Sequence, residues 1–456
     1  MVAGGNMQDT TTIDSKYSPT VGLDKLLIVL AVAAHERRYI SSMDIQGAYL
    51  ECRMEGNPVY MWLNKTLTQS VTAKKPEFSK FVTENGKILV KLERALYGCV
   101  QSAKLWYNKL SEKLIESGYT MNPIDNCIFN KIVRGKQVTV IIYVDDLLLT
   151  HIEQKVLIQE IESIGSGFSG YSSQTTNHIS YLGMEIINCE DGININMNNY
   201  VHKTLEEFGE PKMFNSPSSP NPHMIDGHQP LQLQSREKFH STVARLLYLA
   251  KRVRPDILFT VSILSSKVKE PLQRDMGSLM RLIGYLMKTK NSYVKFRNDT
   301  KLSPTVYCDA SFMSEDDAKS RSGIVICMCG AVVDAHTSKQ KLVAKSSAES
   351  ELIALCEGVS EALAIKEFLS VQGHTVTQVT VYEDNKSTMD LVVAGKPTSR
   401  NTKHINLRYF FVKQHVDNKD INLEYCKTSD MLADIFTKPL IGNQFSKFRD
   451  MMIKVK

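Results

Sequence analysis

The alternation of apolar and polar residues divides the chain into segments of different kinds. Over residues 1–210, short runs rich in Val and Ile, such as 138–150, alternate with helical patterns, which predicts an α+β domain. Residues 211–230 hold five of the 14 prolines together with Ser, Asn and Gly, a composition that breaks both helix and strand. We interpret this segment as a linker or a long surface loop.

Two basic, amphipathic helices are predicted after this loop, because residues 239–268 and 278–290 place apolar and basic residues at helical spacing. The pattern changes from residue 305 to three short strand-like segments, followed by a long helix over 346–372 and a further strand at 377–385. A strand meander followed by alternating helices and strands predicts an α/β domain with a mixed sheet. We therefore divide the chain into domains at 1–210, 211–302 and 303–456.

Composition narrows the class of protein only a little. With 456 residues, 43% hydrophobic and 23% charged, the chain is typical of a globular protein of roughly two to four domains. The net charge of +6 permits a polyanionic partner without requiring one. The nine scattered cysteines indicate neither a disulfide framework nor a CxxC zinc site. The longest apolar stretch, 26–34, is far shorter than the roughly 18 residues of a membrane span, so we expect an intracellular protein.

Two adjacent carboxylates, Asp145 and Asp146, interrupt the apolar run 138–150, where packing gives no reason for charge. Strand-like segments on both sides predict a β-hairpin with the acidic pair at its tip. Like charges held together in a poorly hydrated place repel each other and raise each other's pKa unless a cation neutralises them. This favours a metal site, and a polar turn at the end of a buried strand is the alternative.

The C-terminal domain carries further candidate metal ligands. Asp309 lies in a predicted strand and Asp384 ends another, while Glu349 and Glu351 both open the long helix. Two positions on a helix are about 200° apart, so only one of the two glutamates can face a shared site. Ser346 has the Ser-x-x-Glu spacing of a capping box with Glu349, which leaves Glu351 as the candidate ligand.

Asp434 begins the last apolar helical segment and can reach the same place. Taken singly, each of these acids has an ordinary explanation, such as a strand-edge charge, a helix-start carboxylate or a turn residue. Four acids on separate elements with no matching basic neighbours favour instead a two-metal cluster for phosphodiester chemistry, with ions about 3.5–4 Å apart.

Ten motifs along the chain, in the same order, resemble the Copia-type (LTR) retrotransposon Pol polyprotein, in the region of its reverse transcriptase and ribonuclease H. They are MDIQGAYL, KLERALYGCVQSAKLWYNKL, IIYVDDLLL, YLGMEI, ARLLYLAKRVRPDILFTVSILS, KSRSGIVICMCG, QKLVAKSSAESELIALCEG, VYEDN, TKHINLRYFFVKQHV and LADIFTKPL. The resemblance implies a palm-type polymerase domain, a helical thumb or connection, and a ribonuclease H-like domain with a mixed sheet.

For the polymerase, the resemblance implies that Asp44, Asp145 and Asp146 bind two Mg²⁺ or Mn²⁺ ions for nucleotidyl transfer. Tyr49 matches the aromatic gate beneath the sugar, which favours deoxynucleotides. Gln101 matches a glutamine that packs against the nucleotide, Lys104 lies near phosphate or template, and Leu182 and Gly183 match the hairpin that grips the primer. Cys99, Val100 and Ala103 depart from the family's usual LYGLKQAPRAWY.

For the ribonuclease H part, the resemblance implies that Asp309, Glu351, Asp384 and Asp434 bind a second pair of these ions and hydrolyse the RNA strand of an RNA–DNA hybrid. The basic segment around Arg400, Lys403 and Arg408 is either a track for the hybrid backbone or a solvated helix face. His404 stands about 30 residues before Asp434, and we assign it no catalytic role.

The implied partners are an RNA template, a DNA primer, the RNA–DNA hybrid and dNTPs, with no membrane. A homodimer and assemblies with other Pol or Gag products are compatible with the resemblance, as is a place in cytoplasmic virus-like particles or in the nucleus. The chain opens within the family's polymerase domain, after the basic fingers strands, so we expect Met1 to be an internal methionine of a longer frame. A catalytically silent fragment that only binds nucleic acid or serves as a structural subunit is the alternative function.

Overall fold

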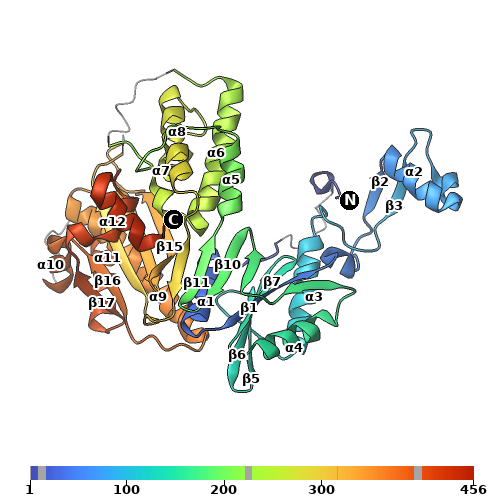
Figure 1. Cartoon of the computed structure of the whole chain (residues 1–456), viewed down its shortest axis with the longest axis horizontal. Coiled ribbons are helices and arrows are strands. Elements are labelled where there is room, and N and C mark those ends of the chain that lie inside the picture. Colours follow the sequence, from blue (N-terminus) through green and yellow to red (C-terminus); the bar gives the residue numbers. More distant parts are fainter. Residues whose placement is uncertain (1, 9–16, 221–228, 316, 395–402, 456) are drawn as a thin grey trace. The chain divides into compact units, whose positions relative to one another are not determined.

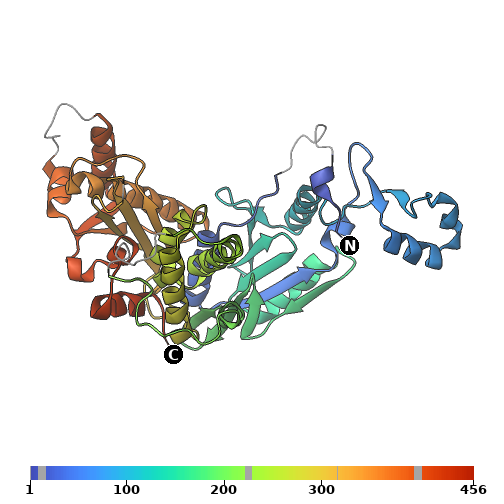
Figure 2. The same cartoon turned by 90° about the horizontal axis from the view of Figure 1, so that it is seen from above.

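The computed structural model describes the chain except residues 1, 9–16, 221–228, 316, 395–402 and 456 (Figures 1 and 2). The chain forms two compact units. Unit 1 comprises Met1–Val21 and Ile40–Thr175, and unit 2 comprises Gly22–Tyr39 and Thr176–Lys456. The domain limits at residues 210 and 302 do not coincide with the limits of these units, and the division into three functional domains stays a prediction. In the described part of the chain, every helix is too short or too polar to cross a membrane.

A six-stranded sheet forms the centre of unit 1, in the order β4-β5-β6-β7-β1-β8. A separate pair, β2 and β3, is antiparallel. The strands are β1 (Tyr39–Ile45), β2 (Tyr60–Leu63), β3 (Ile88–Lys91), β4 (Thr120–Met121), β5 (Ile128–Val133), β6 (Lys136–Tyr143), β7 (Asp146–His151) and β8 (Tyr171–Gln174). The helices are η1 (Gly5–Met7), η2 (Ala48–Glu51), α2 (Lys65–Lys74), η3 (Pro76–Phe81), α3 (Ser102–Glu116) and α4 (Gln154–Gly165).

The predicted hairpin at the acidic pair is confirmed. Strands β6 and β7 pair antiparallel, with Tyr143 opposite Asp146, so that Val144 and Asp145 alone form the turn. Val144 adopts a φ of 56°, a left-handed conformation that β-branched residues rarely take. The indole Nε1 of Trp106, which is 1% exposed on α3, donates a hydrogen bond to the Val144 carbonyl at 2.6 Å. The turn is therefore held from the core of unit 1.

Unit 2 contains a four-stranded sheet in the order β12-β11-β10-β9 and a group of helices in mutual contact, α5 to α8 (Figure 1). The strands are β9 (His178–Tyr181), β10 (Met184–Cys189), β11 (Gly192–Asn196) and β12 (Val294–Arg297). The helices are α1 (Leu23–His35), α5 (Asn198–Glu206), α6 (Leu233–Arg252), η5 (Pro255–Ile257), α7 (Leu258–Ser266) and α8 (Gln273–Lys288). The apolar stretch 26–34 forms the buried body of α1, which packs on β11, β12 and β15.

Two expectations about this region were wrong in part. Residues 239–268 form two helices, α6 and α7, because Pro255 lacks an amide donor and disfavours helical backbone in the residue before it. The described part of the Pro-rich segment contains no helix or strand, but Ser216, Pro217 and Ser218 are buried. Ser218 is hydrogen-bonded to Thr260 of α7 at 2.6 Å, so residues 216–218 pack into the core, whereas Lys212, Met213 and Asn215 before them are exposed as expected for a surface loop.

The C-terminal part of unit 2 has the predicted α/β arrangement. Its five-stranded mixed sheet has the order β15-β14-β13-β16-β17, with β13, β14 and β15 antiparallel and β13, β16 and β17 parallel. The strands are β13 (Thr305–Ser311), β14 (Arg321–Met328), β15 (Ala331–Lys339), β16 (Val379–Glu383) and β17 (Ile421–Tyr425). The helices are α9 (Ser347–Val371), α10 (Lys386–Ala394), α11 (Lys403–Asp417), η6 (Thr428–Asp430), η7 (Leu432–Phe436) and α12 (Gly442–Met452).

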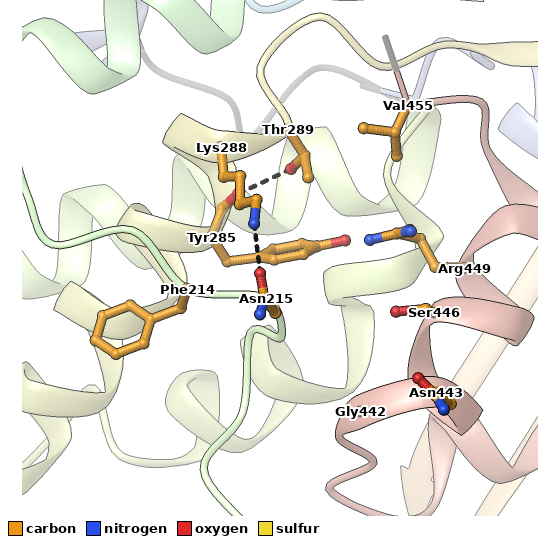
Figure 3. A pocket seen from close by; sticks show the side chains of 10 residues that line it. All are labelled: Phe214, Asn215, Tyr285, Lys288, Thr289, Gly442, Asn443, Ser446, Arg449 and Val455. Carbon is orange, nitrogen blue, oxygen red and sulfur yellow. Dashed lines mark hydrogen bonds between the residues drawn. The ribbon is translucent and has the colours of Figure 1, made fainter.

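A buried ionic network lies beneath α8 and α12. Arg254 and Asp256, 1% and 0% exposed, form a bidentate pair with distances of 2.9 and 2.8 Å, and the Tyr285 hydroxyl donates to Asp256 at 2.7 Å. Beside it a cavity of about 460 Å³ is lined by residues of α8, α12 and 214–215 (Figure 3). In Figure 3 the Tyr285 ring lies between Lys288 and Arg449. The tyrosine thus joins the network to this cavity.

Candidate active sites

The three polymerase candidates lie on neighbouring strands of unit 1. Asp44 is the penultimate residue of β1, Asp145 is in the β6–β7 turn, and Asp146 begins β7, which is adjacent to β1. The Ile45 amide donates to the Asp145 carbonyl at 3.4 Å, which brings the ends of the two strands together. Asp44 and Asp146 are exposed and Asp145 is half-buried.

The electrostatics of this trio suit a cation. Burial raises the pKa of Asp145, the Tyr97 hydroxyl lowers it, and the Asp44 charge raises it. Burial and then the charges of Asp44 and Asp145 raise the pKa of Asp146. Asp145 Oδ1 is buried without a hydrogen-bond partner among the described residues. Three oxygen donors of this kind fit Mg²⁺ or Mn²⁺. Nevertheless, in the part of the chain that the structure describes, the ligand atoms of these three carboxylates do not all lie within 4.8 Å of one another.

Tyr97 is a residue that the sequence analysis missed. Its hydroxyl donates a short hydrogen bond to Asp145 Oδ2, so this carboxylate is held toward the tyrosine. The Tyr97 ring packs on Tyr49 of η2 with a centroid distance of 4.2 Å. Tyr49 is 8% exposed, and burial followed by the Asp145 charge raises its pKa. The proposed sugar gate and the metal ligand are therefore connected through one aromatic pair.

The other polymerase candidates lie in defined places, but their functions are not tested by these contacts. Gln101 is the N-cap of α3, and its Oε1 accepts a hydrogen bond from Gln8 Nε2 at 2.6 Å. Lys104 is half-buried on the first turn of α3. Leu182 and Gly183, with φ of 50° and 76°, form the two-residue turn between β9 and β10 in unit 2. The Tyr248 hydroxyl donates to the Leu182 carbonyl at 3.0 Å.

Three of the four C-terminal acids converge. Ligand atoms of Asp309 (β13), Glu351 (α9) and Asp384, which follows β16, all lie within 4.8 Å of one another. Asp309 and Glu351 are 1% and 5% exposed. Glu351 Oε2 accepts from the Ala310 amide at 2.6 Å, and Asp384 Oδ2 accepts from the Thr428 hydroxyl at 2.7 Å. Three carboxylates on adjoining elements give an oxygen-donor set that fits a divalent cation such as Mg²⁺.

Without a cation this cluster is electrostatically unfavourable. Burial, together with the charges of Asp309 and Glu383, raises the pKa of Glu351 to about 10. Burial and then the Asp309 charge raise the pKa of Asp434 to about 7, against the effect of Lys438. Burial also raises the pKa of Glu383 well above its usual value, and its Oε2 is buried without a hydrogen-bond partner among the described residues. Glu383 is thus a fifth acid here, which the sequence analysis missed.

Asp434 lies in the same region but has a cationic partner. It is 1% exposed on η7, a 3₁₀ helix, and forms a short ion pair with Lys438. Lys438 Nζ also lies 3.3 Å from Asp309 Oδ1, while the Thr437 hydroxyl donates a short hydrogen bond to Asp309 Oδ2. The expectation that the four acids have no matching basic neighbour was therefore wrong. The signal was present, because Lys438 follows Asp434 by four residues.

The helix-start argument for Glu351 is confirmed. The Ser346 hydroxyl accepts from the Glu349 amide at 3.2 Å, and Glu349 Oε2 accepts from the Lys345 amide at 2.7 Å. Glu349 is thus used in capping, while Glu351 faces the cluster.

The basic segment near residue 400 is only partly described. Arg400 and the side chains of Lys403 and His404 lie outside the described residues. Arg408 is half-buried on α11, and its charge lowers the pKa of Glu357 on α9 against the larger effect of burial. The track along the hybrid stays a prediction.

Comparison with known proteins agrees with the motif pattern. Residues 1–218 match the family described as Reverse transcriptase (RNA-dependent DNA polymerase). The chain is 27% identical over 451 residues to the Retrovirus-related Pol polyprotein from transposon RE1 of Arabidopsis thaliana, covering 98% of this chain and 29% of that protein. It is 24% identical over 468 residues to the corresponding polyprotein from transposon TNT 1-94 of Nicotiana tabacum, covering 99% of this chain and 34% of that one. The chain thus spans about a third of these relatives.

Among solved structures, the chain is similar to the foamy viral protease-reverse transcriptase dRH in complex with ds DNA. The TM-score is 0.51 at 14% identity, and the match covers 91% of this chain and 61% of that chain. A likeness at this identity shows the fold alone. Residues 1–218 belong to the reverse transcriptase (RNA-dependent DNA polymerase) family, in a chain that is similar over nearly its whole length to Copia-type retrotransposon Pol polyproteins.

Proposed function

We propose that the chain is an RNA-directed DNA polymerase with ribonuclease H activity on RNA–DNA hybrids, part of a Copia-type Pol polyprotein. The observation that carries the proposal is that two sets of three acidic residues lie on two separate sheets. Asp44, Asp145 and Asp146 lie at strand ends of unit 1, and Asp309, Glu351 and Asp384 converge in unit 2. The implied ligands are an RNA template, a DNA primer, dNTPs and the hybrid product.

In the polymerase site, Asp44, Asp145 and Asp146 would hold two Mg²⁺ or Mn²⁺ ions. Such ions would supply Lewis-acid activation of the primer hydroxyl and charge stabilisation for the leaving pyrophosphate. Tyr97 fixes one oxygen of Asp145 through its short hydrogen bond, which opposes the rise in pKa that burial causes. Tyr49, packed on Tyr97, would press its ring against the sugar and disfavour a ribose. Gln101, the N-cap of α3, and Lys104, on its first turn, would contact the nucleotide and its phosphates.

In the ribonuclease H-like part, Asp309, Glu351, Asp384 and Asp434 would hold the ions. Ions held there would supply activation of the attacking water and charge stabilisation for the departing oxygen. Thr437 and the Ala310 amide orient the oxygens of Asp309 and Glu351 through the hydrogen bonds described above. The Thr428 hydroxyl orients Asp384 in the same way.

Primer extension on an RNA template with Mg²⁺ tests the polymerase proposal. We expect extension by the unmutated chain and a loss of at least about 100-fold in Asp145→Asn, because a neutral amide cannot hold the cation as a carboxylate does. Glu93→Gln is the matched control, since this side chain is 77% exposed in unit 1. Absence of extension by the unmutated chain would contradict polymerase activity of this chain.

Cleavage of a labelled RNA–DNA hybrid tests the second site independently. Asp309→Asn should abolish cleavage and leave extension intact, whereas Asp417→Asn, a variant of an acid that is 59% exposed on α11, should cleave normally. Cleavage that survives Asp309→Asn would refute the ligand assignment. Hybrid binding without either reaction would favour the alternative function, a silent fragment that only binds nucleic acid.

A further inference from the structure

Lys438 places a positive charge inside the carboxylate cluster of the ribonuclease H-like part. Its ammonium group forms ion pairs with Asp434 and with Asp309 Oδ1. The side chain is 37% exposed, so it reaches the buried acids from the surface. Its backbone position is fixed just after η7, where its amide donates to the Asp434 carbonyl at 3.0 Å. The position is therefore built into the turn that carries Asp434.

The acids divide into two groups that share Asp309. Asp309, Glu351 and Asp384 bring their ligand atoms within 4.8 Å of one another, which leaves a place for one cation. Asp309 and Asp434 flank a second place, and there Lys438 bonds to an oxygen of each. A Mg²⁺ ion bound to these same two oxygens at about 2.0–2.1 Å would lie too close to the ammonium group for both to remain.

We propose that Lys438 is a resident cation of this site: it occupies the place of the second metal ion, so that one divalent ion binds tightly to Asp309, Glu351 and Asp384 while a second binds only by displacing the lysine. The inference rests on the metal site of the proposed function and deepens it.

The charges around the lysine support this assignment. The ammonium group faces the carboxylates of Asp309 and Asp434 at once, and two anionic oxygens at hydrogen-bond distance hold a cation in this place. Because like charges a few ångströms apart repel strongly in a partly buried site, Lys438 should weaken the binding of a second divalent ion by at least about tenfold.

Calorimetric titration with MnCl₂ tests the proposal on the full chain. The polymerase acids are first replaced (Asp44→Asn, Asp145→Asn and Asp146→Asn). His336→Gln is added because Asp334, His336 and Glu361 form the other described group that could hold a metal ion, so that uptake in this background reports the Asp309 cluster. We expect one tightly bound ion per chain in this background and two in Lys438→Met, which keeps the length of the stem and removes the charge. The second ion should bind at least about tenfold more tightly than in the background. Lys438→Arg keeps the positive charge and should therefore bind one ion tightly, as the background does.

Lys447→Met is the matched control, because Lys447 pairs with Asp430 at the surface of the same domain and not with an acid of the cluster. It should keep one ion. Electron paramagnetic resonance of bound Mn²⁺ gives a second readout: Lys438→Met should show the signal of two coupled ions, and the background that of one isolated ion.

The outcomes separate the two proposals. If the background binds no Mn²⁺, the metal site itself is wrong, and the proposed function fails together with the inference. If it binds two ions with similar affinity, or if Lys438→Met binds one ion as the background does, the role of Lys438 is refuted and the metal site stands. Should Lys438→Met fail to fold, Lys438→Gln and the coupled Mn²⁺ signal decide in the same way.

Discussion

Removing Asp256 should destabilise unit 2 strongly, because this carboxylate neutralises a fully buried guanidinium. Arg254 is 1% exposed and donates twice to Asp256, and its other donors reach the Thr289 carbonyl at 3.1 Å and the Thr289 hydroxyl at 2.7 Å. In Asp256→Ala the Arg254 charge stays buried without its partner. Breaking a buried pair in this way costs about 3–5 kcal/mol, and we expect a loss in this range in the free energy of unfolding.

Two further variants separate the contributions to this loss in the free energy of unfolding. Tyr285→Phe removes one hydrogen bond to the carboxylate and should cost about 1.5–3 kcal/mol. The double variant Arg254→Met/Asp256→Ala removes both charges, so it should be more stable than Asp256→Ala alone. This order of stabilities distinguishes an uncompensated charge from a simple loss of packing volume.

Urea unfolding followed by circular dichroism and by Trp fluorescence measures the effect and locates it. The only two tryptophans, Trp62 and Trp106, lie in unit 1, so their fluorescence reports that unit, while circular dichroism reports both. Tyr285→Phe serves as the control of smaller effect. A loss below about 1 kcal/mol in Asp256→Ala, or a double variant less stable than the single one, would refute the reasoning.

Three other predictions concern single contacts. Val144→Gly relieves a β-branched residue from its φ of 56° and should raise the stability of unit 1 by about 1 kcal/mol in Trp-monitored unfolding; a loss of stability would contradict the strain. Trp106→Phe leaves the Val144 carbonyl without its donor and should cost about 1–3 kcal/mol, with the remaining emission red-shifted because Trp62 is 54% exposed. The Asp334 hydrogen bond raises the pKa of His336 against burial, so this pair stabilises unit 2 below the unfolded pKa of about 6.5 and loses its effect as pH rises through the folded pKa. His336→Gln should therefore be more destabilising near pH 5.5 than near pH 8.5, and equal losses at both would contradict the pair.

The sequence predicted those parts of the sites that depend on local geometry. The acidic hairpin follows from the apolar alternation around Asp145, and the choice of Glu351 over Glu349 follows from helix periodicity and the Ser346 cap. Tyr97 could not be found in this way, because it meets Asp145 across 48 residues of sequence, through the tertiary packing of unit 1. No local pattern carries such a contact.

Other differences between the prediction and the structure have a local signal in the sequence. Pro255 marks the break between α6 and α7, since proline restricts the residue before it. The apolar–basic periodicity continues across the break and hid it. Lys438 follows Asp434 by four residues, which on an exposed α-helix would be an ordinary surface ion pair. The sequence predicted a helix from Asp434, but the structure has the short 3₁₀ helix η7 there, and the pair is part of the acidic cluster.

The position of α1 has a consequence for the order in which this chain can fold. Its residues 26–34 are buried in unit 2, although the next 136 residues, 40–175, form unit 1. Its packing partner β12 begins at Val294, about 260 residues after α1 ends, and at about 5–20 residues per second the ribosome needs roughly 13–50 s to make that stretch. The apolar helix α1 therefore lacks its packing partner β12 throughout that time. A piece of the chain that starts at residue 176 would lack this helix and expose the surfaces of β11, β12 and β15 that it covers.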